Sequence, residues 1–159
     1  MAGRETLATR AARAAGIEHV VHEYVHDPAA ESYALEAAAA LGLDPARVFK
    51  TLVVADGGGP AGDGLAVCIV PAATTLDLKA VGKRAAMAPT ERAERVTGYV
   101  AGGISPLGQR RALPTILDDS ALAHTTVFVS AGRRGLELEL APADLVALTR
   151  ARVRRLRRV

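Results

Sequence analysis

A chain of 159 residues, half of them apolar, is long enough to bury one substantial core, so we expect a single domain over residues 1–159. Aromatic residues make up only 3% and tryptophan is absent, so Val, Leu, Ile and Ala must build that core. No apolar run is long enough to cross a bilayer, and the start MAGRETLATR lacks the apolar segment of a signal peptide. The single cysteine, Cys68 in the run LAVCIVP, excludes an internal disulfide and indicates a buried small side chain in a reducing, cytoplasmic protein.

Positive charge is concentrated at the C-terminal end of the sequence. The formal net charge is +3, yet six of the 20 basic residues lie in the last ten positions, RARVRRLRRV, which leaves 14 basic against 17 acidic groups in the preceding 149. An arginine-rich helical end can bind RNA phosphates without reading sequence. The alternative is a solvated C-terminal helix whose arginines complement the negative end of its dipole.

Helices and strands are predicted to alternate along the chain. Helical spacing of apolar residues, the stop residues Gly16 and Gly42 and the N-cap candidates Ser32 and Asp44 set the first boundaries. In chain order we predict a helix over 4–15, a strand over 19–25, a helix over 33–41, strands over 49–54 and 65–71, a helix over 76–87, a short helix over 90–96, strands over 113–117, 125–130 and 136–140, and a last helix from 142. Several strands are joined by hairpins, among them the glycine-rich connection GGGPAGDG over 57–64, so a mixed sheet in an α+β domain fits better than a doubly wound one.

Three histidines near the first strand raise the question of a metal site. On a strand, His19 and His22 point to opposite faces, whereas His22, Tyr24 and His26 share one face. Neither an HExxH motif nor a cysteine pair occurs in the sequence. We therefore expect no metal, and a strand edge lined by Tyr24 and polar groups instead.

Lys50 is unusual because it interrupts the apolar strand FKTLVV. Burial of an unpaired ammonium group is costly, so Lys50 either reaches solvent at the strand end or points into a cleft to meet an anionic group. Lys79, Lys83 and Arg84, in contrast, have the spacing of an ordinary solvated basic face.

The loop over residues 97–118, TGYVAGGISPLGQRRALPTILD, contains four glycines and two prolines. Such a loop can present backbone N–H groups to an anion or a polarised carbonyl, although the same composition suits a plain surface connection. The nucleophile motif GxSxG and the phosphate loop GxxxxGK[ST] are absent from the sequence. The residues alone thus indicate a site that binds an anionic substrate and stabilises an oxyanion, without identifying a protein nucleophile.

Five segments closely resemble the YbaK/EbsC family, which belongs to the superfamily of the prolyl-tRNA synthetase editing domain. They occur in family order from near the N-terminus to about residue 145: EYVHDP (23–28), VFKTLVV (48–54), TLDLKAVGK (75–83), the loop over 97–118, and VSAGRRGLELEL (129–140). The resemblance implies an α+β fold with a mixed, partly barrel-like β-sheet surrounded by helices, and it implies neither a cofactor nor a metal.

The resemblance also implies a trans-acting aminoacyl-tRNA deacylase. The best-fitting subgroup removes cysteine from mischarged tRNA for proline, with the substrate's thiol attacking its own ester. Two alternatives stay open: a deacylase of Ala- or Ser-tRNA that uses water, and a non-catalytic module that binds tRNA ends or a synthetase. Whether the protein works in a complex with prolyl-tRNA synthetase also stays open.

The family's site residues are carried over by position. Lys50 resembles the functional lysine that holds the 3′-terminal adenosine, and we expect the backbone amides from Gly102 and Gly103 to Ser105 to face the developing oxyanion. The implied substrate-binding residues are Tyr24, Thr51, Ile104, Ser105, Ser130 and Glu137, and the candidates for RNA contact are Arg110, Arg111, Arg133 and the C-terminal arginines. The family usually has Asp at the position of Glu137 and often Gly at that of Ala131, which leaves the pocket size and the choice of amino acid open.

Overall fold

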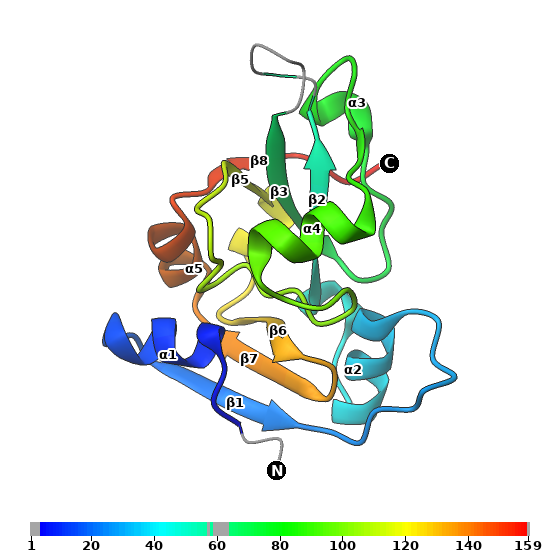
Figure 1. The fold of residues 1–159 in the computed structure, drawn as a ribbon. Coiled ribbons are helices and arrows are strands. Elements are labelled where there is room, and N and C mark those ends of the chain that lie inside the picture. The colour runs from blue at the N-terminus through cyan, green and yellow to red at the C-terminus, as the bar shows by residue number, and fades with distance from the viewer. Residues whose placement is uncertain (1–3, 57, 59–63, 159) are drawn as a thin grey trace.

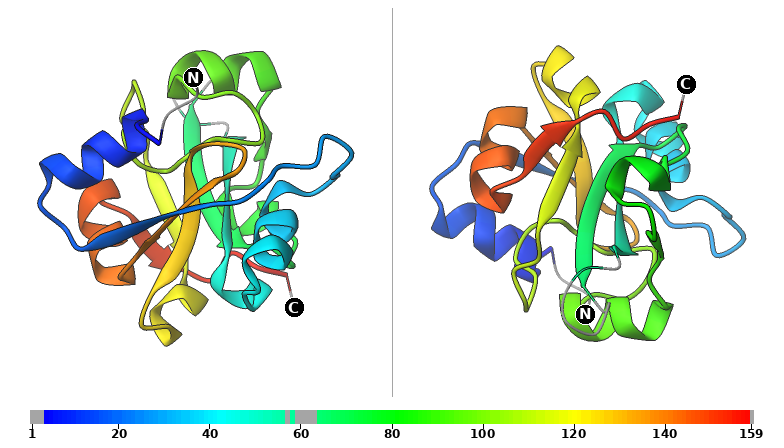
Figure 2. Two further views of the ribbon diagram at one scale, coloured as in Figure 1. Left: turned by 90° about the horizontal axis from the view of Figure 1, so that it is seen from below. Right: turned by 90° about the horizontal axis from the view of Figure 1, so that it is seen from above.

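Short strands form two β-sheets that helices flank (Figures 1 and 2). The computed structural model describes residues 4–56, 58 and 64–158. A three-stranded antiparallel sheet has the order β1-β7-β6, with β1 over His19–Glu23, β6 over Val127–Arg133 and β7 over Leu136–Leu140. A five-stranded mixed sheet has the order β4-β2-β3-β5-β8, with β2 over Phe49–Ala55, β3 over Leu65–Pro71, β4 over Ala86–Met87, β5 over Thr115–Asp118 and β8 over Arg152–Arg154. In the second sheet, β5 is parallel to both β3 and β8.

The helices begin and end where side-chain caps and glycines place them. The Ser32 hydroxyl accepts the Leu35 N–H at the start of α2, and Gly42 ends that helix in the left-handed region at φ 68°. The α-helices are α1 over Leu7–Ala14, α2 over Tyr33–Leu41, α3 over Leu78–Val81, α4 over Thr90–Thr97 and α5 over Pro142–Thr149; short 3-10 helices cover Pro45–Arg47 and Asp119–Ala123.

Strand alternation gives the three-stranded sheet two different faces. The apolar side chains of β6 and β7 that include Val129 and Leu138 enter the main core between the sheets. The opposite face carries Phe128 and Glu137 and is covered by α2, whose Ala37 packs with Phe128 in a smaller apolar cluster. The two sheets are linked at a parallel bridge between Val48 and Phe128.

The α+β class and the mixed sheet are confirmed, but the strands divide between two sheets, and in the described part of the chain these do not close into a barrel. The predicted helix over 76–87 is wrong over most of its length. Only α3 is helical, because Gly82 ends it and residues 86–87 pair with β2. The glycine-rich connection was expected over 57–64, and of this stretch residues 57 and 59–63 lie outside the described residues.

The expected arginine-rich helical end is also corrected. Helix α5 ends at Thr149, Arg150 adopts a left-handed conformation at φ 55°, and the chain continues as β8 along β5. Leu156 is fully buried, and the Asp118 carboxylate accepts the Leu156 N–H at 2.8 Å. The C-terminal segment is therefore part of the fold rather than a free basic tail.

No helix within the described ranges is long and apolar enough to cross a membrane.

Candidate active site

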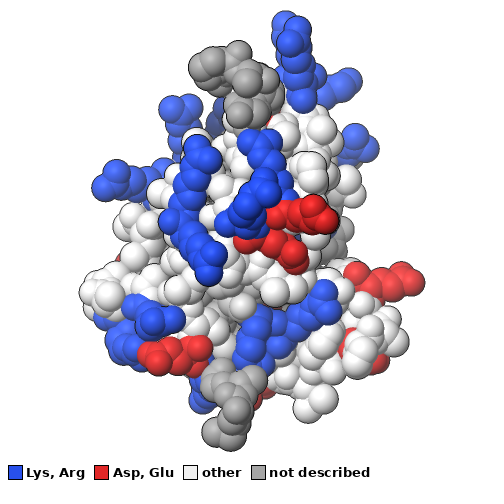
Figure 3. All heavy atoms as spheres, in the orientation of Figure 1, with Lys and Arg blue, Asp and Glu red and all other residues white. Residues whose placement is uncertain are grey.

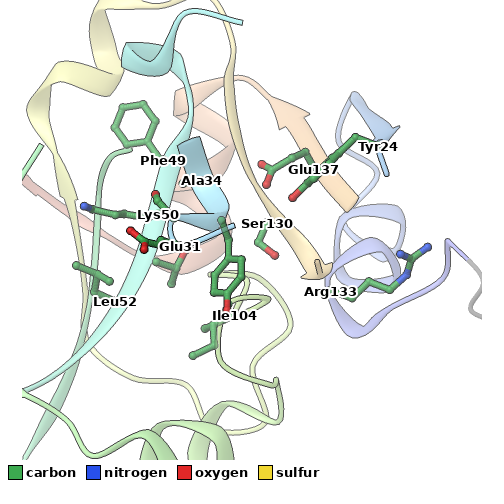
Figure 4. A pocket seen from close by; sticks show the side chains of 14 residues that line it. Tyr24, Glu31, Ala34, Phe49, Lys50, Leu52, Ile104, Ser130, Arg133 and Glu137 are labelled. Carbon is green, nitrogen blue, oxygen red and sulfur yellow. The ribbon is translucent and has the colours of Figure 1, made fainter. Parts of the chain in front are cut away.

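A cavity of about 280 Å³ lies where β2 and the three-stranded sheet diverge (Figure 4). Strand β2 supplies one wall, β6 and β7 the second, the N-terminal end of α2 the third, and the glycine-rich loop the fourth. A cavity of this volume accommodates a small ligand or one end of a larger one. Its lining residues are Tyr24, Glu31, Ser32, Tyr33, Ala34, Phe49, Lys50, Thr51, Leu52, Gly102, Ile104, Ser130, Arg133 and Glu137.

Lys50 takes the cavity position that sequence analysis foresaw as one of two outcomes. It is half-buried, and its Nζ donates to the Thr74 carbonyl oxygen at 2.7 Å. Burial lowers the pKa of the Lys50 ammonium. Within the described residues Lys50 forms no ion pair with a carboxylate, so two of its three N–H donors remain for an anionic or carbonyl group.

Glu137 is a buried acid on the opposite side of the cavity. Its residue is 5% exposed, and its Oε2 has no hydrogen-bond partner among the described residues. Burial raises the pKa of Glu137 from 4.5 to about 8, so the side chain is mostly a neutral carboxylic acid at pH 7. Ser130 lies directly across the β6–β7 ladder from it, and the two side chains share the cavity face of the sheet.

Tyr24 borders the same part of the cavity, just beyond the end of β1. Its backbone N–H donates to the Gly135 carbonyl at 2.9 Å, which fixes it beside the β6–β7 turn. Burial raises the pKa of the Tyr24 hydroxyl and outweighs the opposing hydrogen bond from the Gly135 backbone, so the hydroxyl stays a neutral donor. In Figure 4 the Tyr24 and Glu137 side chains approach the cavity from the same side, while the Lys50 ammonium lies at the far end.

An unpaired stretch of β2 forms part of the wall. Beyond its ladder to β3, the strand is held at its other edge by the bridge at Val48 and by the Ala88 N–H that donates to the Val53 carbonyl. The Ala72 N–H donates to the Val48 carbonyl, so the backbone groups of Val48 point toward β3. In an antiparallel ladder this direction alternates from residue to residue, so the backbone groups of Thr51, three residues later, point toward the other edge of β2. The Thr51 hydroxyl is itself buried and has no partner among the described residues.

The glycine-rich loop reaches the cavity through two of its residues. Gly102, at φ 87°, and Ile104 line the wall. A Cβ on Gly102 would lie 2.5 Å from the Tyr33 ring and 2.6 Å from the Arg134 Nε, so the close packing here requires glycine. Arg134 stacks on Tyr33, with its Cζ 4.0 Å from the ring centroid, and donates to the Ala101 carbonyl at 2.9 Å.

The structure does not bring every predicted residue to the cavity. Gly103 is buried behind the wall and its N–H donates to the Val100 carbonyl at 2.9 Å, while the buried Ser105 hydroxyl accepts the Leu107 N–H. Neither residue lines the cavity. Of the backbone amides expected to face the oxyanion, only those of Gly102 and Ile104 therefore belong to cavity-lining residues. The three predicted RNA contacts are split: Arg133 lines the cavity, whereas Arg110 and Arg111 lie beside α4.

The histidines are held by separate partners. His22 Nε2 lies 2.9 Å from the Glu139 Oε1, and His26 Nδ1 lies 2.7 Å from the Glu36 Oε1. Within the described ranges, no group of three or more His, Cys, Asp and Glu side chains is arranged to hold a metal ion.

With the site defined, the chain was compared with known proteins. Residues 27–148 match the model of the aminoacyl-tRNA editing domain. The chain belongs to this family. It is 38% identical over 118 residues to EbsC of Enterococcus faecalis, a protein named as a candidate Cys-tRNA(Pro)/Cys-tRNA(Cys) deacylase; the alignment covers 70% of this chain and 69% of that protein. The YbaK/EbsC resemblance is therefore confirmed.

Two solved structures share the editing-domain fold over nearly the whole chain. A protein described as a candidate trans-editing enzyme for prolyl-tRNA synthetase is 29% identical, with a TM-score of 0.78 over 98% of this chain and 99% of that one. The hypothetical protein APE2540 is 25% identical, with a TM-score of 0.82 over 96% of this chain and 100% of that one.

Sequence reasoning missed several residues of this editing-domain site. Tyr33 and Arg134 join α2, the loop and the β6–β7 turn, yet only Arg133 of the arginine pair was singled out. A signal for Tyr33 was present, since it is one of three tyrosines in the chain and directly follows the N-cap of an alanine-rich helix. The strand is irregular between Ser130 and Arg133, where Gly132 lies at φ 111°, so simple alternation along the strand could not decide between Arg133 and Arg134.

Proposed function

We propose that the protein is a trans-editing aminoacyl-tRNA deacylase that clears Cys-tRNA(Pro) and works as one domain, in the cytoplasm, without a cofactor. The editing-domain family and the name of the EbsC relative support this proposal. A structural relative is described as a candidate trans-editing enzyme for prolyl-tRNA synthetase, and we extend this partnership to the present chain.

The observation that carries the proposal is the composition of the cavity. Lys50 and the neutral acid Glu137 stand at opposite ends of a volume suited to an aminoacyl ester, and neither cysteine nor histidine is among the described residues that line it. A serine activated by a histidine, as in the common acyl-transfer enzymes, is therefore not available at this wall. In this proposal the nucleophile is either the thiol of the substrate itself or a water molecule from solvent.

For a cysteinyl ester, the substrate can supply a thiolate that is already populated near neutral pH. The thiolate sulfur attacks the ester carbonyl carbon, the bond from that carbon to the ribose oxygen breaks, and a four-membered thiolactone leaves. The thiol proton goes to solvent, and the ribose oxygen takes a proton to become a hydroxyl. The protein contributes by holding the ester in the bent conformation that this attack needs.

Three groups of the cavity suit the charges that develop. Lys50 is placed to bind a phosphate or ribose oxygen of the terminal nucleotide, because a half-buried ammonium with a neutral partner gains most from an anion. The backbone N–H of Thr51, on a rigid strand, and that of Gly102 are candidates to receive the carbonyl oxygen as it becomes negative. Glu137, as a carboxylic acid, is placed to protonate the departing ribose oxygen.

The test is a deacylation assay with Cys-, Ser- and Ala-tRNA on the same tRNA(Pro) body. We expect Cys-tRNA to be cleared fastest, and Lys50→Ala to lower its kcat/KM by about 100-fold, the size of effect seen when a preorganised charged contact is removed. Lys83→Ala, an exposed lysine, is the matched control and should match the wild type. Near-normal turnover by Lys50→Ala would show that the cavity does not bind the ester as proposed.

The same panel separates the neighbouring activities. Preferential hydrolysis of Ser- or Ala-tRNA would assign the nucleophile to water, since a hydroxyl or methyl side chain cannot replace the thiol in ring closure. Absence of turnover on every substrate, with tRNA still bound, would identify a non-catalytic binding module.

A further inference from the structure

Four arginines line a second hollow, away from the residues of the cavity. It has a volume of about 260 Å³, and we call it the arginine groove. Arg92 and Arg95 come from α4, and Arg110 and Arg111 from the loop that follows it. Among the described residues that line the hollow, none is Asp or Glu. Figure 3 shows blue side chains beside the part of this face where Figure 1 places α4, with red side chains next to them.

The backbone fixes this gathering of charge. Arg92 and Arg95 are three residues apart on α4 and so lie on one side of the helix. The Arg110 N–H donates to the Thr97 carbonyl at 3.0 Å, and the Arg111 N–H donates to the Val96 carbonyl at 3.2 Å, which docks the loop on the last turn of the helix.

The side chain of Arg110 is also held in place. Its stem packs over Gly98, where a Cβ would lie only 2.8 Å from the Arg110 Cγ. The groove is therefore built into the fold, because its arginines are brought together by hydrogen-bonded backbone and close packing.

Three of the four groove arginines, Arg95, Arg110 and Arg111, are in no ion pair within the described part of the chain. The carboxylate of Glu94, the nearest acid in sequence to Arg95, accepts the Ala101 N–H at 2.7 Å. The negative end of α4 offsets part of the repulsion between the guanidinium groups near the helix end. The remaining positive potential is concentrated in a hollow, where it attracts polyanions.

We propose that the arginine groove binds the phosphodiester backbone of the tRNA substrate while its 3′ end occupies the cavity. The inference rests on the proposed deacylase function. It is supported by the loop over residues 98–114, which supplies Gly102 and Ile104 to the cavity and Arg110 and Arg111 to the groove. A strand of RNA held by the groove is thereby positioned relative to the ester by one continuous, hydrogen-bonded segment. Arg133, at the cavity, is then the RNA contact nearest the reacting end.

The experiment measures the affinity of uncharged tRNA(Pro) as a function of salt for the wild type and for the groove variant Arg95→Gln/Arg110→Gln/Arg111→Gln. Each lost phosphate contact lowers the slope of log K against log[salt] by about 0.7–0.9, so we expect the slope to fall by about two to three. The matched control, Lys79→Gln/Lys83→Gln/Arg84→Gln, removes the same charge from an exposed region near α3 and should leave the slope within about 0.5 of the wild type.

A second measurement separates the groove from the reaction. With Cys-tRNA(Pro), the groove variant should raise KM at least tenfold with kcat little changed, while with the 3′-cysteinyl ester of adenosine it should match the wild type. If the wild type cleaves neither substrate, the deacylase proposal fails, and the salt slope still decides whether the groove binds tRNA.

An unchanged slope in the groove variant, or an equal fall in the control, would overturn the inference. If the triple variant does not fold, as judged by circular dichroism, Arg95→Gln and Arg111→Gln are measured singly. Each single variant should then lower the slope by about 0.7–0.9. If neither does, the inference is overturned.

Discussion

Replacement of Glu137 by Gln tests whether this acid is uncharged in the folded protein. Gln has nearly the same shape and no charge, so it reproduces the protonated form of the residue. In the unfolded chain Glu137 loses its proton near pH 4.5, whereas burial keeps the proton on the folded protein up to about pH 8. Between these values folding takes up a proton, so the free energy of unfolding of the wild type falls as the pH rises.

The size of the effect follows from the two pKa values. Each pH unit between about 4.5 and 8 costs the wild type about 1.4 kcal/mol, which gives on the order of 5 kcal/mol above pH 8. The contribution of Glu137 to stability is fully present below pH 4.5 and is lost by about pH 8. The stability of Glu137→Gln does not depend on this protonation, so it does not fall between pH 4.5 and 8 for this reason. We therefore expect the variant to match the wild type at pH 4 and to be more stable by a few kcal/mol at pH 8.

Urea unfolding of both proteins at pH 4, 5, 6, 7, 8 and 9 measures this difference. The control is Glu139→Gln, on the same face of β7. Burial raises the pKa of Glu139, but hydrogen bonds from Thr126 and His22 and the charge of Arg47 together lower it by more. The pKa of Glu139 is therefore below its usual value. That carboxylate stabilises the fold above its unfolded pKa and loses the effect in acid, so Glu139→Gln should be destabilised at pH 7. A difference for Glu137→Gln that does not change between pH 5 and 8 would refute a neutral Glu137.

Two further substitutions test the supports of the site and of the fold. Arg134→Gln removes the stacking on Tyr33 and the hydrogen bond to the Ala101 carbonyl, two contacts that position the glycine-rich loop. We expect at least a tenfold loss of kcat/KM on Cys-tRNA(Pro), with partial rescue by Arg134→Lys. Equal activity of the wild type and both variants would contradict this positioning role. Leu156→Ala should lower the free energy of unfolding by about 2–5 kcal/mol in urea, because Leu156 is fully buried; a loss below about 1 kcal/mol would mean that the C-terminal segment does not pack as described.

Local sequence signals predicted the elements that carry their own boundaries. The run LAVCIVP forms β3 over the predicted residues and is buried throughout, with Cys68 fully inside. Helix α2 begins at its predicted cap and ends at its predicted glycine. The alternation LELEL gives β7, and it correctly places Glu137 and Glu139 on the face opposite the leucines.

Long-range contacts decided the parts that the sequence could not predict. The arginine-rich end became β8 because the buried Asp118 carboxylate accepts two backbone N–H groups there and pairs with Arg157. Asp118 precedes that segment by more than 30 residues, so no local sequence pattern predicts the contact. Glu137 is likewise buried on the sheet face that α2 covers, and α2 lies about 100 residues earlier in the chain, so local sequence could not predict this burial.

The glycine-rich loop reaches the cavity, but not all of the amides expected there line it. Four glycines suggested a wall of free amides, but the folded loop uses the Gly103 amide for its own turn with Val100. The edge of β2, which composition marked only by Lys50, instead turns the backbone of Thr51 toward the cavity. A donor on a strand that is hydrogen-bonded to its neighbour is held more rigidly than one on a loop, and rigidity is what stabilisation of a developing oxyanion requires. A deacylase whose substrate supplies the nucleophile thus needs fixed donors more than a reactive side chain, and strand β2 is the element of this fold best able to provide them.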